Sequence, residues 1–211
     1  MTTYHHGHLR EALTATAYEL ARTDGPDGVV LREVARRTGV SHNAAYRHFA
    51  DRDELLSDVA GLAMDQLAQA MLTRIGAITD GSPEQRAWRH LAATGRAYVE
   101  FALAEPGLFA IAFAGHEPAD HEGEPDPAAP GPYDVLGGVL DELVAVGEIA
   151  PADREGADLY CWAAVHGFAL LHLGGPLAAE PPAARAEALE RLLATIARGL
   201  GAPADPTLQE S

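Results

Sequence analysis

The side chains most suited to chemistry in this chain cluster between residues 41 and 49. Four of them carry hydrogen-bonding groups, namely His42, Asn43, Arg47 and His48. On one helix their spacing leaves Ala45 and Phe49, four residues apart, to pack inward. The segment therefore predicts a short helix whose outer face offers hydrogen bonds, as a helix that reads the DNA major groove requires.

The residues just before this segment predict a partner helix. A helix is expected over 31–38, with Val34 and Ala35 pointing inward. Gly39 ends it, and Ser41 is a good N-cap for the helix that follows. Two short helices joined by a three- to four-residue turn with a glycine form a helix-turn-helix, whose second helix enters the major groove.

The charge distribution permits DNA contact at one end of the chain. The net charge of the 211 residues is −16, which argues against nucleic acid at first sight. Residues 31–52, however, carry five arginines against Glu33 and Asp51. The chain has no lysine, so each permanent side-chain cation is a guanidinium suited to bidentate phosphate or guanine contacts. The acidic remainder should confine DNA to this end.

The amino-acid sequence of the N-terminal quarter resembles that of the tetracycline-repressor family of bacterial transcription regulators. The matching elements are Tyr4-His5-His6-Gly7, Gly39-Val40-Ser41, Tyr46-x-His48-Phe49 and Phe49-x-x-Arg52-x-x-Leu55. A second stretch, Trp162-Ala163-Ala164-Val165-His166-Gly167, resembles the Trp-x-x-x-His-Gly segment in the C-terminal domain of one branch of that family. The resemblance implies an all-α DNA-binding regulator.

The motif and the resemblance together give a predicted set of DNA-contacting residues. The set is Arg32, Ser41, His42, Asn43, Ala44, Tyr46, Arg47, His48 and Arg52. Arg52 stands where the family usually has a phosphate-binding lysine, although a solvated arginine at a helix start is the alternative. Val30 replaces the Ser or Thr that usually caps the second helix. The missing cap lowers stability by about 1 kcal/mol.

Helical periodicity and turn residues predict an all-α protein of about nine helices in two domains. The expected helices span 7–23, 31–38, 41–49, 52–78, 83–104, 107–114, 132–146, 151–173 and 182–200. Residues 1–52 should form a three-helix helix-turn-helix domain, and residues 53–201 a helical ligand-binding and dimerisation domain. We expect a mobile loop over 116–131 and a disordered tail over 202–211.

The resemblance implies a small-molecule effector site in the C-terminal domain. The residues that could line it are Trp88, Phe109, Phe113, Trp162 and His166. Core packing is the alternative for Trp162 and His166, which lie four apart and share a helix face. An apolar or aromatic effector, neutral or cationic, would suit these side chains and the acidic domain.

Two further expectations concern assembly and regulation. The helices over 151–173 and 182–200 carry more apolar faces than a small domain can bury, which predicts a homodimer with Leu193 and Ile196 at its interface. The chain is expected to repress transcription and to leave its operator DNA when the effector binds. A DNA-binding regulator without any small-molecule effector is the alternative.

Other classes find little support. No histidine, cysteine and carboxylate grouping has zinc-like spacing, and no phosphate loop, nucleophile elbow or Glu-x-x-His pairing is present. We therefore expect no metal, no cofactor and no catalytic residue. Cys161 is the only cysteine and no apolar run could cross a membrane, which favours a reducing cytoplasm.

Overall fold

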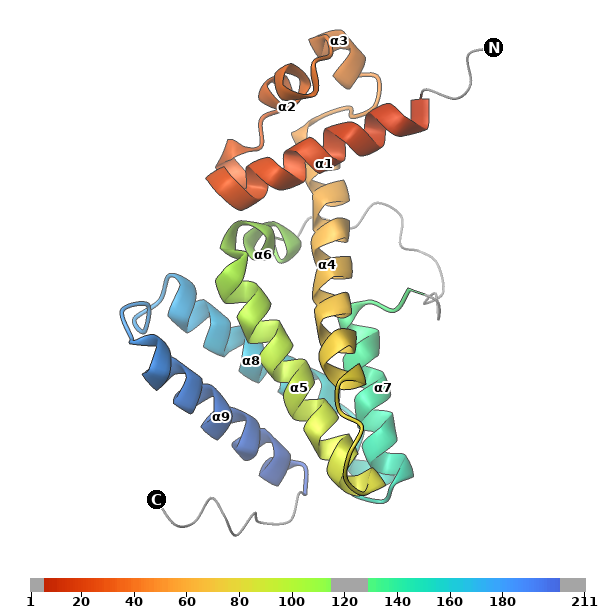
Figure 1. Ribbon diagram of the computed structural model, residues 1–211, viewed down its shortest axis with the longest axis vertical. Coiled ribbons are helices and arrows are strands. Elements are labelled where there is room, and N and C mark those ends of the chain that lie inside the picture. The colour runs from red at the N-terminus through yellow and green to blue at the C-terminus, as the bar shows by residue number, and fades with distance from the viewer. Residues whose placement is uncertain (1–5, 115–128, 202–211) are drawn as a thin grey trace. The chain divides into compact units, whose positions relative to one another are not determined.

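The computed structural model describes residues 6–114 and 129–201, and within these ranges all regular structure is helical (Figure 1). The elements in order are α1 (His6–Asp24), the 3-10 helix η1 (Pro26–Gly28), α2 (Leu31–Thr38), α3 (His42–Ala45), α4 (Arg52–Gly76), α5 (Pro83–Ala104), α6 (Pro106–Ala112), α7 (Pro132–Ala145), the 3-10 helix η2 (Pro151–Asp153), α8 (Ala157–Leu173) and α9 (Pro182–Gly199). The predicted all-α fold is confirmed.

Helix ends follow the capping chemistry of the sequence. At the start of α5 the Gln85 amide donates to Ser82 Oγ over 3.3 Å, and the Ser82 amide donates to Gln85 Oε1 over 3.0 Å. This reciprocal pair satisfies two donors that a helix N-terminus leaves open. Val30 makes no side-chain cap at α2, so the missing cap expected from the sequence is confirmed.

The predicted helix over 41–49 is much shorter in the structure. Only His42–Ala45 is α-helical, and a turn carries the chain on to Phe49. The reason is a change in hydrogen bonding, because the Arg47 amide donates to Ala44 O over 3.3 Å and the His48 amide to Ala45 O over 2.9 Å. These three-residue closures tighten the chain as in a 3-10 turn.

The predicted helix over 151–173 is interrupted. The 3-10 helix η2 is followed by Gly156, whose φ of 77° lies in the left-handed region that ends regular helix. Regular α-helix begins only at Ala157. The tail expected over 202–211 and almost all of the loop expected over 116–131 lie outside the described residues.

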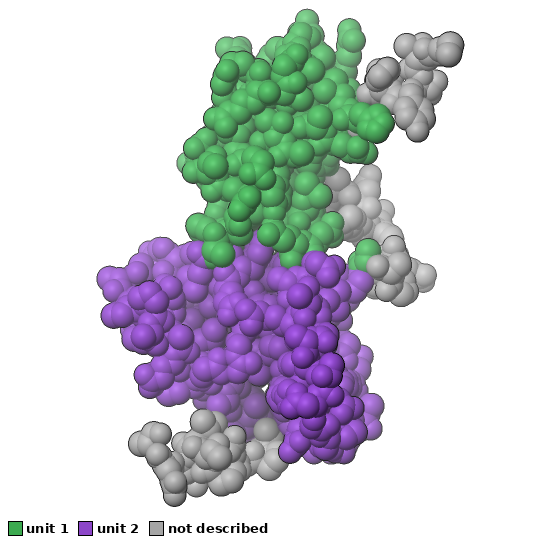
Figure 2. All heavy atoms as spheres, viewed as in Figure 1, with its two compact units in different colours: residues 1–66, 104–129 green, residues 67–103, 130–211 purple. Residues whose placement is uncertain are grey.

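The chain folds as two compact units, coloured separately in Figure 2. The first unit comprises residues 1–66 and 104–129, and the second residues 67–103 and 130–211. The first unit thus reaches beyond residues 1–52 and includes α6, which packs against α1. Their close approach needs Gly107, since a Cβ there would lie 2.0 Å from Ala21 O.

The second unit is built on a core shared by α5, α7 and α8. The fully buried members are Ala87, Leu91, Leu136, Val139, Leu140, Leu143, Ile149, Ala157 and Cys161. Helix α9 packs beside α8, and an ion pair between Arg96 and Glu190 links it to α5. These four helices form most of the wall of the pocket described below, and Met71 of α4 completes it.

Candidate nucleic-acid interface and ligand pocket

The turn between α2 and α3 has the geometry of a helix-turn-helix. Gly39 ends α2 at φ 77°, and the Val40 amide donates back to Ala35 O over 3.0 Å. This closure satisfies a terminal carbonyl of α2 in the Schellman manner. Ser41 Oγ then accepts the Ala44 amide over 3.2 Å and starts α3.

The outer face of α3 and the turn after it is polar and exposed. Its exposed side chains are His42, Asn43, Tyr46 and Arg47. Tyr46 is 46% exposed, although a tyrosine usually buries its ring, and its ring lies 4.4 Å from that of His42. Ala45 and Phe49 are completely buried on the inner side, as the spacing predicted. This leaves a small aromatic and hydrogen-bonding surface open to a partner.

The five arginines of residues 31–52 are not equivalent. Glu33 accepts from both Arg36 and Arg37, with Nε–oxygen distances of 2.8 Å in each case. Hydrogen bonds from Arg36 first, and then from Arg37, lower the pKa of Glu33 to about 2, so this carboxylate is ionised at neutral pH. Arg32 and Arg47 are both exposed, and neither guanidinium makes a hydrogen bond or ion pair with the residues that the structure describes.

Arg52 is engaged within the first unit. Its Nε donates to Val29 O over 2.7 Å and its Nη2 to Pro26 O over 2.6 Å. These bonds tie the first residue of α4 to the loop that precedes α2. Arg52 therefore anchors this loop, and any phosphate contact would add to that role.

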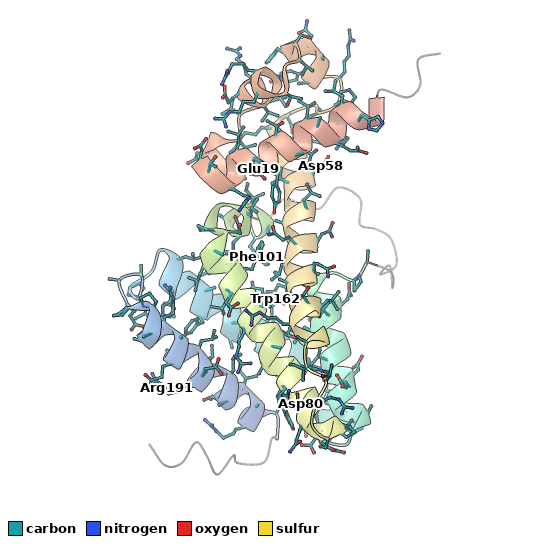
Figure 3. All side chains as sticks on the ribbon, viewed as in Figure 1. Glu19, Asp58, Asp80, Phe101, Trp162 and Arg191 are labelled. Atoms are coloured by element: carbon teal, nitrogen blue, oxygen red, sulfur yellow. The ribbon has the colours of Figure 1, made fainter. Side chains whose placement is uncertain are left out.

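Arg10 on α1 joins three segments of the first unit. Its Nε and Nη2 bind the two oxygens of Asp58 on α4 over 2.8 and 2.7 Å. Its Nη1 donates to His48 O over 2.8 Å and to Glu54 Oε1 over 3.0 Å. The guanidinium also lies 4.3 Å from the ring centre of Phe49. Figure 3 labels Asp58 on α4 beside α1.

The second unit contains an apolar pocket with about 470 Å³ of space, including its open mouth. Its lining comes from α4, α5, α7, α8 and α9, and consists of Met71, Trp88, Leu91, Ala92, Thr94, Gly95, Tyr98, Leu136, Cys161, Trp162, Val165, Leu193, Ile196 and Ala197. Figure 3 labels Trp162 on α8.

The polar groups around this pocket are held by neighbours in the second unit. Tyr98 Oη lies 2.7 Å from His166 Nδ1, and Trp88 Nε1 donates to Glu148 Oε2 over 2.7 Å. Burial raises the pKa of the Tyr98 hydroxyl and lowers that of His166, so both groups are neutral at pH 7. Burial also raises the pKa of the Cys161 thiol to about 11.

Comparison with known families agrees with both features. Residues 13–59 match the family described as bacterial regulatory proteins, tetR family, and residues 91–196 match the tetracyclin repressor-like C-terminal domain. The second match alone covers half of the chain. The chain belongs to the tetracycline-repressor family. Members of this family are DNA-binding transcriptional regulators, and they are not enzymes.

Relatives within the tetracycline-repressor family extend this result. An HTH-type transcriptional regulator of Mycobacterium tuberculosis is 29% identical over 152 residues, which cover 68% of this chain and 62% of that protein. The class C tetracycline repressor protein of Escherichia coli is 42% identical over 64 residues, 30% of this chain and 26% of the repressor. The chain thus matches less than two thirds of either relative's length.

A solved structure matches nearly the whole chain. It is a protein of unknown function from Rhodococcus sp. RHA1, with a TM-score of 0.71 and 32% sequence identity. The match covers 95% of this chain and 100% of that one. This tetracycline-repressor family chain therefore shares its fold with that protein over nearly its full length.

The structure brings together only part of the ligand-lining set predicted from the sequence. Trp88 and Trp162 line the pocket. His166 is not part of the lining and contacts it through its hydrogen bond with Tyr98. Phe109 and Phe113 belong to the first unit, where α6 packs on α1, and their rings lie 4.7 Å apart. The α6 helix is thus a separate element from the pocket wall.

Sequence reasoning missed two features of this tetracycline-repressor family protein. Arg10 was not singled out, although it lies three residues before Leu13 and seven before Ala17, on the inward face of α1. A cation on such a face indicates a carboxylate partner, because an unpaired charge would be costly there. Leu193 and Ile196, expected from the sequence at a dimer interface, also line the pocket.

Metal sites and membrane spans place their own requirements on the described residues. No group of three or more His, Cys, Asp or Glu side chains in the described part of the chain could hold a metal ion. Among the described helices, none is long and apolar enough to cross a membrane.

Proposed function

We propose that this chain is a cytoplasmic repressor that binds operator DNA as a homodimer and is released by a neutral small molecule. The observation that carries the proposal is the exposed face formed by Asn43, Tyr46 and Arg47, directly after a helix-turn-helix turn. An exposed tyrosine and an arginine with an unpaired guanidinium, both in the turn after a one-turn helix, contribute little to the stability of the fold. They suit contacts to base edges and phosphates.

Arginines with and without a carboxylate partner are assigned different contributions to DNA binding. Arg32 and Arg47 have uncommitted guanidinium groups and are assigned to phosphates or guanine. Arg36 and Arg37 share Glu33, so their joint charge toward DNA is smaller than their number suggests. We assign the contacts to base edges to His42, Asn43 and Tyr46. Three further residues of the predicted set, Ser41, Ala44 and His48, lie beside them in the sequence.

A homodimer is supported by an apolar row that α8 leaves open to solvent. Leu159, Tyr160, Leu170 and Leu171 are 63%, 69%, 50% and 43% exposed. Ala163 is exposed between them, and a Cβ added at Gly167 would meet no atom within 4 Å. Exposed apolar rows of this length usually mark an interface. A second copy, packed about a two-fold axis, would cover the row and present two recognition elements to successive major grooves.

The pocket lining narrows the chemistry of the effector. Among the described residues that line it there is no Asp, Glu, Arg or His. Placing an ion there without a partner would cost on the order of several kcal/mol. We therefore assign the site to a neutral molecule whose apolar or aromatic body lies against Trp88, Tyr98 and Trp162.

Helix α4 offers a route from the pocket to the DNA-reading face. Met71 near its C-terminal end lines the pocket, and Arg52 at its first residue holds the loop before α2. A ligand that favours a shifted α4 would disturb that loop. A difference in affinity of about 1–3 kcal/mol between the two states is typical of such coupling.

Selection from a pool of random DNA duplexes tests the DNA-binding part. The protein should enrich one two-fold symmetric sequence whose half-sites are about one helical turn apart or somewhat further. Failure to enrich any sequence over several rounds, with folded protein, would contradict sequence-specific binding.

The effector part has an internal reporter. Trp88 and Trp162 are the only two tryptophans of the chain, and both line the pocket. A compound that changes tryptophan emission and dissociates the selected duplex supports the proposal. If compounds from a metabolite extract that quench emission leave the DNA complex intact, a regulator without a small-molecule effector is favoured.

A further inference from the structure

The segment after α3 is held by Arg10 of α1 and by the partner of Arg10 on α4, Glu54. Arg10 binds the carbonyl of His48 directly and lies over the ring of Phe49. The amide of Ala50 donates to Glu54 Oε2 over 2.6 Å, and the other oxygen of Glu54 accepts from Arg10. Residues 48, 49 and 50 are therefore fixed in succession by a single guanidinium and its partner.

The held segment controls the DNA-reading residues because it is bonded back to α3. The amides of His48 and Phe49 both donate to Ala45 O, over 2.9 and 3.1 Å. Tyr46 and Arg47 lie between these anchor points. A one-turn helix has few hydrogen bonds of its own, so its orientation depends on what fixes its end.

The other edge of the guanidinium is fixed to α4. Asp58 accepts two bonds from Arg10 and a further one from Thr14 Oγ1 over 3.2 Å. Only an arginine fork can bind a carboxylate bidentately while its remaining nitrogen reaches a carbonyl. A lysine at position 10 keeps the charge but cannot make this set of bonds.

We propose that Arg10 is the positioning residue that sets the orientation of the DNA-reading turn. The proposal rests on the sequence-specific DNA binding put forward above, and it assigns Arg10 no contact with DNA. Losing the arrangement should weaken binding to the selected sequence more than binding to random DNA. Phosphate attraction to random DNA depends on charge, whereas base contacts depend on the pose of the side chains.

A second arginine–carboxylate ion pair that involves α1 supplies a matched control. Arg22 binds Glu105 bidentately over 2.9 and 2.8 Å, within the same unit. The side-chain exposures of this pair, 42% and 15%, are close to the 36% and 19% of Arg10 and Asp58. The Arg22 side chain bonds to Glu105 and Glu19 and not to residues 42–50, so Arg22→Lys repeats the chemical change away from the turn.

The experiment compares dissociation constants for the selected duplex and a random duplex of equal length. The specificity ratio is the dissociation constant for random DNA divided by that for the selected duplex. Arg10→Lys should lower this ratio by at least about tenfold, the size of one lost base contact. Arg22→Lys should leave the ratio within about twofold, as surface substitutions usually do. The salt dependence on random DNA should be the same for all three proteins, because no charge changes.

Two controls keep the result decisive. Asp58→Glu also preserves charge and disturbs the bidentate geometry, so it replaces Arg10→Lys if that variant fails to fold, and its ratio should fall likewise. A variant that melts at lower temperature but keeps the wild-type ratio would overturn the positioning role. A wild-type ratio near one would instead refute sequence-specific binding itself.

Discussion

At the scale of single residues, the structure separates arginines that are bonded within the first unit from those whose guanidinium groups have no partner among the described residues. Arg10 and Arg52 bind backbone carbonyls of the first unit, and Arg36 and Arg37 share one carboxylate. Charge counting over residues 31–52 could not make this distinction, because it depends on which carboxylates and carbonyls lie within reach. We therefore expect Arg32 and Arg47 to carry phosphate neutralisation.

The salt dependence of DNA binding tests this separation. Arg32→Ala should reduce the slope of log affinity against log salt by about 1 for each protomer, as expected when one phosphate contact is lost. Arg36→Ala removes the same charge from the same helix but from a guanidinium already paired with Glu33. Its effect on the slope should be smaller. Equal changes in slope for the two variants would contradict the division.

At the scale of elements, α2 begins without the side-chain cap that the position allows. Val30 has an extended backbone at φ −116° and ψ 126°, is 49% exposed, and makes no cap hydrogen bond. Val30→Ser should raise the free energy of unfolding by about 1 kcal/mol, because its hydroxyl would accept an open amide of α2. Urea unfolding measures the change.

Val30→Ala separates capping from the loss of an exposed apolar side chain. The alanine variant has no acceptor, so it should show no gain in stability. If serine and alanine have the same effect on unfolding, the account of the α2 start is wrong.

Helix ends that carry an explicit capping or turn residue were well predicted, and for a physical reason. Ser82, Pro83 and Gly39 act through local bonds that the sequence itself specifies. The short α3 and the break at Gly156 depend on choices between competing closures, which local sequence leaves open. Apolar spacing also could not tell whether Leu193 and Ile196 face a second copy or the interior of their own unit.

At the scale of the whole molecule, the net charge of −16 makes association a matter of specific faces. The open apolar row on α8 is the face that can offset repulsion between two copies. Tyr160→Glu combined with Leu170→Glu should yield monomers in sedimentation equilibrium at micromolar concentration, since two charges would be buried in the interface.

A control for added acidity is available on α4. Leu72 is 37% exposed and lies outside the α8 row, so Leu72→Glu should leave the protein dimeric. If the α8 variant also remains dimeric, the two copies meet through another surface. The monomers should also bind the selected duplex more weakly, because each then places only one recognition element.

Fluorescence anisotropy of the selected duplex, titrated with wild type and with Tyr46→Ala combined with Arg47→Ala, tests the DNA-reading face most directly. Tyr133→Ala combined with Arg191→Ala removes the same exposed residue types, 53% and 68% exposed, from the second unit as a control. The first variant should lose at least about a hundredfold in affinity while keeping its helicity, and the control should change it by less than about threefold. Equal affinities for wild type and the Tyr46 and Arg47 variant would contradict the central claim.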